Sequence, residues 1–258
     1  MKYLILAFML FCNLNVFANE KLFNLPIEGR ADNYAPILQN AHSNGAVNLI
    51  LIPGGNAGTG AVSNGVPSSR NFLVRSRNDF TSQGFNTFVI FRSKSTDANV
   101  MATTYRNTDE HANELKSLIN HIGTLNKNPI WIIGTSMGTI STTTAALKIS
   151  NPQIKGIVLT ASVTNKAPGN LADQALDGIK LPVLMIHHES DACFACVPME
   201  AMRLFDKFTN APRKEFYMVK GGGPVSGDPC QNQHWHGFIG IEEAVTSQIA
   251  SWIKANSN

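Results

Sequence analysis

The chain contains 258 residues, of which 43% are hydrophobic, and this is enough for one α/β domain with a sizeable core. The formal net charge is only +3, and the lysines and arginines are scattered along the chain. No basic run indicates a nucleic-acid or phosphate-rich partner, so we expect no nucleic acid to bind.

The first 18 residues have the pattern of a secretory signal peptide. Lys2 supplies a positive start, residues 3–12 are mostly aliphatic, and residues 16–18 offer a small-residue cleavage site before Asn19. The apolar run is too short to span a bilayer comfortably, and an uncleaved anchor is the alternative. No second apolar run approaches that length. We expect residues 1–18 to be removed, residues 19–258 to form one periplasmic or secreted domain, and no stable membrane insertion after cleavage.

Residues 20–45 are irregular and polar, with one or two edge strands expected around residues 21–28. Residues 46–52 form the first convincing buried strand, and they lead into the glycine-rich loop 53–60. This loop lacks the Gly-Lys-Ser/Thr of a P-loop and the glycine spacing of a dinucleotide-binding motif. In a serine hydrolase, such a loop turns a backbone N–H toward the carbonyl oxygen under attack.

A helix is expected over residues 71–83 and a second buried strand over residues 85–91. In the polar loop 92–108 that follows, Ser95, Asp97 and Tyr105 are candidates for facing the site. Thr108 or Asp109 caps the next helix. Its apolar side chains recur at helical spacing and predict one buried face, formed by Ala112, Leu115, Leu118, Ile119 and Ile122.

The central motif is Gly-Thr-Ser-Met-Gly at residues 134–138. An apolar, β-rich run precedes it at 129–133, and small, hydroxyl-rich residues suited to a packed helix follow at 139–149. Strand, Gly-x-Ser-x-Gly and helix together form a nucleophile elbow, a strained turn that exposes Ser136 Oγ above a parallel sheet. Gly134 and Gly138 are required because a Cβ at either position would collide with the neighbouring strand or helix.

The remaining elements continue the alternation of strands and helices. Strands are expected at 155–160, 181–188 and 213–219, and helices at 198–208 and 241–254. Only about twenty residues separate the first two of these strands, which is too few for a cap domain, so we expect an open site. The alternation predicts a mostly parallel sheet covered by helices on both faces.

A serine nucleophile needs a base and an orienting acid, which should follow it along the chain in the order acid, then histidine. Asp191 lies just beyond the end of the strand 181–188, and Glu189 is its rival. His236 stands shortly before the last helix and is favoured on position over His234. His187 and His188 point to opposite faces of their strand, so we interpret both as structural or site-lining residues.

Together these residues resemble the α/β-hydrolase superfamily over nearly the whole mature chain, and most closely small exported bacterial serine hydrolases or esterases. The matching segments are 53–55, 71–77, 134–138, 187–193 and 236–238. The resemblance implies an α/β-hydrolase fold without a large cap domain. It also implies Ser136 as nucleophile, Asp191 as acid and His236 as base, with an oxyanion hole formed by the backbone of Met137 and of Gly55 or Asn56. The loop departs from the His-Gly-Gly-Gly of many lipases, so the sequence leaves the loop donor open.

The expected reaction is hydrolysis of a carboxylic ester of a small acyl substrate, without a cofactor or metal. Thioester or peptide cleavage would use the same residues, and the sequence determines neither the substrate nor the oligomeric state. One alternative is a zinc site made from Cys193, Cys196, Cys230, His234 and His236. Another is a binding protein that has the fold without activity.

Three cysteines remain after the signal peptide, an odd number for an oxidising compartment. Cys193 lies two residues after the proposed acid, and Cys230 lies six before the proposed base. If acid and base meet, their loops run side by side, which predicts a Cys193–Cys230 disulfide and a free Cys196. A Cys196–Cys230 bond and a Cys193–Cys196 bond are the alternatives.

Overall fold

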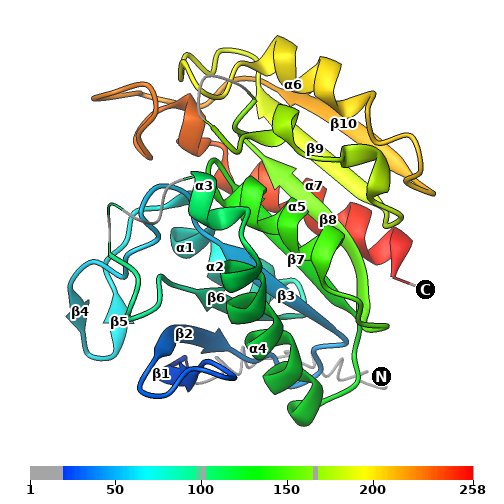
Figure 1. Ribbon diagram of the computed structural model, residues 1–258. Coiled ribbons are helices and arrows are strands. Elements are labelled where there is room, and N and C mark those ends of the chain that lie inside the picture. Colours follow the sequence, from blue (N-terminus) through cyan, green and yellow to red (C-terminus); the bar gives the residue numbers. More distant parts are fainter. Residues whose placement is uncertain (1–19, 98, 100–102, 165–167, 258) are drawn as a thin grey trace, which may run out of the picture.

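The computed structural model describes residues 20–97, 99, 103–164 and 168–257. The expected signal peptide lies outside these residues. The described chain contains an eight-stranded sheet in the order β1-β2-β6-β3-β7-β8-β9-β10 (Figure 1). Only the pairs β1–β2 and β2–β6 are antiparallel, so β2 alone runs against the other strands. No helix of the described residues is long and apolar enough to cross a membrane.

The strands of the sheet are β1 (Lys21–Pro26), β2 (Tyr34–Asn40), β3 (Val47–Ile52), β6 (Phe85–Ile90), β7 (Ile130–Thr135), β8 (Ile154–Thr160), β9 (Val183–His188) and β10 (Lys214–Val219). A separate exposed hairpin consists of β4 (Val62–Ser63) and β5 (Val66–Pro67). The helices are α1 (Phe72–Arg75), α2 (Arg77–Ser82), α3 (Thr103–Arg106), α4 (Asp109–Leu125), α5 (Gly138–Lys148), α6 (Pro198–Phe205) and α7 (Glu242–Asn256). Three single 3₁₀ turns complete the elements: η1 (Leu171–Asp173), η2 (Leu176–Gly178) and η3 (Trp235–Gly237).

Two separate hydrophobic cores cover the two faces of the sheet. Strand side chains alternate between the faces, so Ile132 faces α4, α5 and α6, whereas Ile133 faces α1, α2 and α7. Figure 1 shows α4 and α5 in front of the sheet and α7 passing behind it. Strands β3, β6, β7 and β9 are buried along their whole length, which explains their nearly continuous apolar runs. The predicted doubly covered, mostly parallel sheet is confirmed.

The structure corrects three expectations about the first half of the chain. Strand β2 forms where an irregular segment was expected, because Pro36 and the polar Gln39 and Asn40 obscure its alternation. The helix expected over 71–83 breaks at Ser76 into α1 and α2. The loop 92–108 contains the short helix α3, which contacts α4 and α5.

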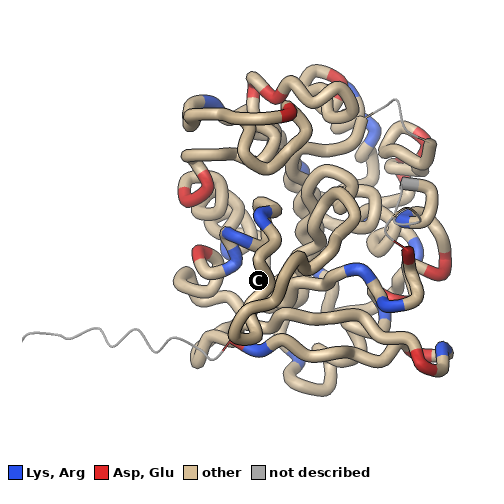
Figure 2. Tube along the Cα trace, turned by 90° about the vertical axis from the view of Figure 1, so that its left-hand side faces the viewer, with Lys and Arg blue, Asp and Glu red and all other residues tan. Residues whose placement is uncertain are grey.

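Charged residues of both signs are distributed along the described chain. Figure 2 shows lysines and arginines interspersed with aspartates and glutamates along the trace.

Candidate active site

Ser136 stands in the sharp turn between β7 and α5. Its φ of 53° is positive, an unusual backbone conformation for a residue with a side chain. A Cβ at Gly134 would overlap the carbonyl oxygen of Gly138, and a Cβ at Gly138 would overlap that of Ile52. The two glycines therefore let strand and helix approach closely, while the strained residue between them projects its hydroxyl. This is the local geometry that the motif predicts.

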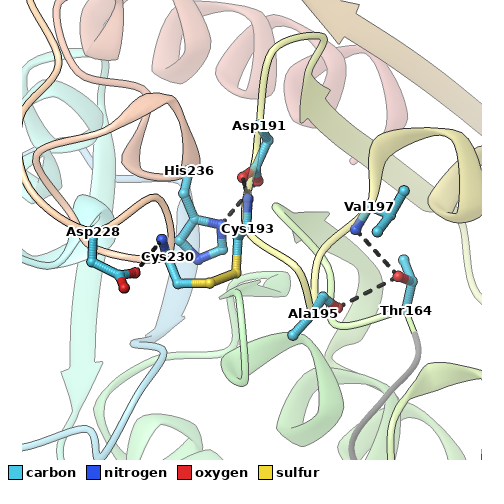
Figure 3. The surroundings of a disulfide bond; sticks show 8 residues. All are labelled: Thr164, Asp191, Cys193, Ala195, Val197, Asp228, Cys230 and His236. Atoms are coloured by element: carbon cyan, nitrogen blue, oxygen red, sulfur yellow. Dashed lines mark hydrogen bonds and ion pairs between the residues drawn. A yellow bond between two sulfur atoms is a disulfide. The ribbon is translucent and has the colours of Figure 1, made fainter.

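Asp191 and His236 come together from loops 45 residues apart. His236 Nδ1 lies 2.9 Å from Asp191 Oδ2, and both residues are buried. The second carboxylate oxygen of Asp191 accepts a hydrogen bond of 2.9 Å from the backbone N–H of Cys193. With both oxygens occupied, the carboxylate is fixed in orientation, and it in turn fixes the imidazole ring (Figure 3). Because a carboxylate only accepts, Nδ1 carries a proton and Nε2 is left to act as a base.

A cleft of about 660 Å³ connects Ser136 with His236. One part of its wall is apolar, with Met137, Val163, Phe194 and Ala195. Another part is polar and includes Asn56, Ser69, Asn71, Gln231 and Asn232. Among the described residues that line the cleft, none is an aspartate, glutamate, lysine or arginine. The cleft thus suits an uncharged ligand with both apolar and polar parts.

Backbone amides near Ser136 are available to a ligand. In the described residues, the N–H groups of Met137, Gly55 and Asn56 donate to no acceptor within the protein. All three residues line the cleft. Gly54 allows this close approach, because a Cβ there would lie 2.7 Å from Ser136 Cβ. Unpaired donors at the end of a parallel sheet can stabilise a developing negative charge.

The disulfide joins Cys193 and Cys230, with an S–S distance of 2.04 Å, and Cys196 is free and buried. This is the pairing that the sequence favoured. Figure 3 shows the bond beside the His236 ring, linking the loop after β9 to the loop before η3. Burial raises the pKa of the Cys196 thiol far above its ordinary value, and Asp191 adds to this, whereas a hydrogen bond with the Ser136 hydroxyl lowers it. Cys196 is therefore an unreactive thiol beside Ser136.

In the part of the chain that is described, no hydrogen bond connects Ser136 with His236. Cys196 lies near Ser136, and both residues line the cleft. Hydrogen bonds at such sites often tighten only when substrate is bound.

The other histidines have structural contacts away from the cleft. His187 Nε2 accepts a hydrogen bond of 2.8 Å from the backbone N–H of Ser162, and burial lowers the pKa of His187 to about 4. His188 contacts the Gly221 carbonyl and accepts from the N–H of Ser190. His234 packs edge-on against Trp235 and does not line the cleft. Glu189 is exposed and also lies outside it.

The expectation that Ser95, Asp97 and Tyr105 face the site is wrong. None of them lines the cleft, and the Tyr105 hydroxyl instead donates to Glu114 at 2.8 Å in the interior. Ser95 and Asp97 precede α3, and Tyr105 lies within it. Sequence reasoning also missed Gln231 and Asn232 as lining residues, although their position between Cys230 and His236 was a usable signal.

Among the described residues, the potential metal ligands of Cys193, Cys196 and His236 all lie within 4.8 Å of one another. Zinc binds cysteine as a thiolate. The Cys193 sulfur is already bonded to Cys230, so it has no thiolate to offer. The donor set of the zinc alternative is therefore incomplete in the disulfide-bonded protein.

The sequence matches no protein-family model, and no curated protein matches it significantly. Solved structures do resemble the fold. A dienelactone hydrolase from Anabaena variabilis superimposes with a TM-score of 0.66 at 14% identity, over 93% of this chain and 99% of that chain. A cold-adapted esterase from an Arctic intertidal metagenomic library gives 0.62 at 16% identity, over 93% and 94%. An esterase from Pyrococcus furiosus gives 0.64 at 14% identity, over 94% of each chain. On its sheet order and these superpositions, the chain has the α/β-hydrolase fold.

Proposed function

We propose that the protein is an exported serine hydrolase that cleaves a carboxylic ester through Ser136, His236 and Asp191. The observation that carries the proposal is the placement of an elbow serine and a carboxylate-bound histidine in one cleft, next to unpaired backbone amides. A fold alone does not establish an activity, so the proposal depends on these groups.

In the proposed acylation step, Ser136 Oγ attacks the ester carbonyl carbon, and its proton passes to His236 Nε2. The carbonyl oxygen becomes an oxyanion that accepts hydrogen bonds from the Met137 amide and a loop amide. Asp191 stabilises the imidazolium through the Nδ1–H. The intermediate then collapses, the C–O bond to the alcohol breaks, and His236 protonates the departing alkoxide.

In the proposed deacylation step, a water molecule takes the place of the alcohol. His236 removes a proton from this water as it attacks the acyl carbon, and a second oxyanion forms. Collapse breaks the bond to Ser136 Oγ, which recovers its proton from His236, and the carboxylic acid leaves. The reaction consumes one ester and one water and requires no cofactor.

The walls of the cleft support a neutral ester as the substrate class. Among the described residues that line it, none is an aspartate, glutamate, lysine or arginine. His236 becomes positively charged only while it holds the proton taken from Ser136 or from water. Burying an unpaired ligand charge there would be costly, which favours a neutral ester. The apolar wall at Met137, Val163 and Phe194 suits an acyl chain. Peptide or thioester cleavage on the same three residues is the alternative.

Ser136→Ala should abolish ester turnover and leave the melting temperature unchanged, because the hydroxyl supports no core. The measurement is hydrolysis of p-nitrophenyl esters of graded acyl length, beside acyl thioesters and aminoacyl p-nitroanilides. Ser68→Ala, an exposed serine outside the cleft, is the matched control. A fluorophosphonate should label Ser136 in the wild-type protein. Turnover by Ser136→Ala at the wild-type rate would refute the mechanism. Faster hydrolysis of the anilides than of the esters would show that the bond cleaved is a peptide bond rather than an ester.

The proposal of export is supported by the disulfide, which persists in oxidising compartments. Export should remove the chain before Asn19. Mass spectrometry of the N-terminal peptide from the periplasm or medium tests this, and a retained Met1 would contradict it.

A further inference from the structure

Arg106 lies behind the loop that carries the candidate oxyanion amides. It is completely buried, and its Nη2 donates to the backbone carbonyls of Gly55 at 2.9 Å and Pro53 at 3.2 Å. Its Nη1 donates to Ser141 Oγ on α5 at 2.8 Å. One guanidinium thus ties loop 53–57 to the helix that begins at the nucleophile elbow.

A chain of hydrogen bonds leads from Arg106 to Glu114. Ser141 Oγ lies 2.8 Å from His111 Nε2, and His111 Nδ1 lies 3.0 Å from Glu114 Oε2. Burial lowers the pKa of His111, with the hydrogen bond to Glu114 acting in the opposite direction, so the ring is neutral near pH 7. Arg106 then donates to Ser141, Ser141 donates to His111 Nε2, and His111 Nδ1–H donates to the carboxylate. Each group therefore has a donor or acceptor role that its neighbours satisfy, along a chain from the buried guanidinium of Arg106 to the buried carboxylate of Glu114.

Glu114 supplies the countercharge. Its carboxylate also accepts from Ser93 at 2.6 Å and from Tyr105 at 2.8 Å, and Arg30 Nη1 lies 3.7 Å away. Burial would raise the pKa of Glu114, but the hydrogen bonds from His111, Ser93 and Tyr105 outweigh it and keep the carboxylate charged. Burying two opposite charges is a costly way to stabilise a fold. The arrangement of Arg106 and Glu114 instead places the guanidinium next to two backbone carbonyls of loop 53–57.

The geometry of the peptide bond connects Arg106 with one amide. In a planar trans peptide, the C=O and the following N–H point in opposite directions. Because the Gly55 carbonyl points inward to Arg106, the Asn56 N–H is directed away from Arg106. Asn56 lines the cleft, and its N–H has no acceptor among the described residues.

We propose that Arg106 is a positioning residue that holds the Gly55–Asn56 peptide with the Asn56 N–H toward the cleft, as the loop donor of the oxyanion hole. The inference rests on the proposed function, since an oxyanion forms only if Ser136 attacks a carbonyl. It also decides between Gly55 and Asn56, which the sequence left open.

Arg106→Met removes the donors and keeps a side chain of similar length. We expect kcat for a p-nitrophenyl ester to fall about 100-fold, the low end of the loss seen for one oxyanion donor. KM should change little, and fluorophosphonate labelling of Ser136 should slow in parallel with kcat. Arg106→Lys should recover part of the loss, because one ammonium cannot reach all three acceptors. The matched control is Arg77→Met, which removes another buried arginine that contacts a backbone carbonyl, that of Val74, outside the cleft.

A spectroscopic measurement separates positioning from general destabilisation. In wild-type protein labelled with a fluorophosphonate, the Asn56 amide proton should shift strongly downfield, and the Gly55 amide should not. The shift should disappear in labelled Arg106→Met and persist in Arg77→Met. If Arg106→Met does not fold, Ser141→Ala serves instead, and its kcat should fall several-fold with KM unchanged.

The outcomes distinguish the two proposals. If wild-type turnover disappears in Ser136→Ala but folded Arg106→Met or Ser141→Ala retains wild-type kcat, the role of Arg106 is refuted and the proposed function stands. A strong shift at Gly55 rather than Asn56 would also refute it. If the wild-type protein neither turns over esters nor reacts with the fluorophosphonate, the proposed function itself fails, while the hydrogen exchange of the Ala57 amide still tests Arg106. That amide donates to Gly54 in the loop turn and should exchange faster in Arg106→Met, and unchanged exchange would refute the positioning role.

Discussion

At the scale of the residue, Asp191 illustrates how one carboxylate sets the state of a histidine. One oxygen is held by the Cys193 amide and the other faces His236 Nδ1 at 2.9 Å. The ring therefore has a single favourable tautomer, with its lone pair on Nε2. Glu189, two residues earlier in the chain, is exposed and makes no such contact with His236.

Asp191→Asn should lower kcat by up to about 10⁴-fold, because an amide at this position favours the wrong imidazole tautomer. The check is the kcat for a p-nitrophenyl ester, with the melting temperature recorded beside it. Glu189→Gln is the control and should leave kcat unchanged. If Glu189→Gln lost its activity while Asp191→Asn kept it, the orienting acid would be Glu189 and not Asp191.

At the scale of the element, η3 carries His236 and is anchored on two sides. The Cys193–Cys230 disulfide fastens the chain that leads into it to the loop after β9. On the other side, Arg75 of α1 donates to the Gly237 carbonyl and pairs with Glu242 of α7 at 2.9 Å. These two connections hold η3 in place together with its packing on β9 and the burial of Phe238 against Phe72.

Opening the disulfide should lower activity before it unfolds the core. The bond closes a sequence separation of 37 residues, which corresponds to a stabilisation of at most about 4 kcal/mol in the chain-entropy model. A double variant, Cys193→Ser with Cys230→Ser, should keep its far-UV circular dichroism at 25 °C but lose about tenfold or more in kcat, because small displacements of a base are costly. Cys196→Ser is the control for replacing a cysteine sulfur by oxygen without loss of the disulfide. Full activity of the double variant would show that the disulfide does not position the base.

Arg75→Met should also lower kcat, by about tenfold, since the Gly237 carbonyl next to His236 loses its donor. Arg77→Met, two residues along the chain, contacts Val74 and Glu20 instead and should leave kcat unchanged. Steady-state kinetics of the two variants, compared at equal fractions of folded protein, provide the test. Equal kcat values in both would exclude a role for Arg75 in placing η3.

At the scale of the whole molecule, the buried histidines couple stability to pH. His187 is fully buried between β8 and β10, where it stacks on Phe216 and accepts a hydrogen bond from the Ser162 amide. Burial lowers its pKa to about 4, Asp191 acts to raise it, and His236 acts to lower it. The folded state thus binds a proton at His187 less readily than the unfolded state, whose pKa is near 6.5.

Because the folded-state pKa is depressed, the unfolded state binds more protons below pH 6.5, and the stability falls as the pH falls. Between pH 6.5 and pH 4, His187 should account for a loss of about 3 kcal/mol in the free energy of unfolding. His187→Gln, which keeps an acceptor for the Ser162 amide, should flatten this dependence in urea unfolding curves. His121→Gln on the partly exposed side of α4 should leave it unchanged. Parallel pH dependences of wild type and His187→Gln would contradict the prediction.

The features that the sequence determined are formed by neighbouring residues or depend on the order of elements along the chain. The elbow could be predicted because its strand, turn and helix are consecutive in the chain. The turn has no room for a Cβ at two positions, so these positions must be glycine, and glycines can be read in the sequence. The parallel sheet followed from alternating apolar runs. The meeting of Asp191 and His236, and with it the disulfide, followed from their order after Ser136 and their places beside strand and helix ends.

Only the tertiary structure decided which polar side chains support these groups. Arg106 contacts partners 35, 51 and 53 residues away, and such hydrogen bonds leave no periodic pattern in the sequence. The sequence did not show whether Tyr105 lines the cleft. Only the packing of α3 against α4 and α5 shows that its hydroxyl bonds Glu114 in the interior. The loop donor stayed open for the same reason, because the carbonyl that precedes the Asn56 N–H is held by Arg106, a residue 51 positions further along the chain.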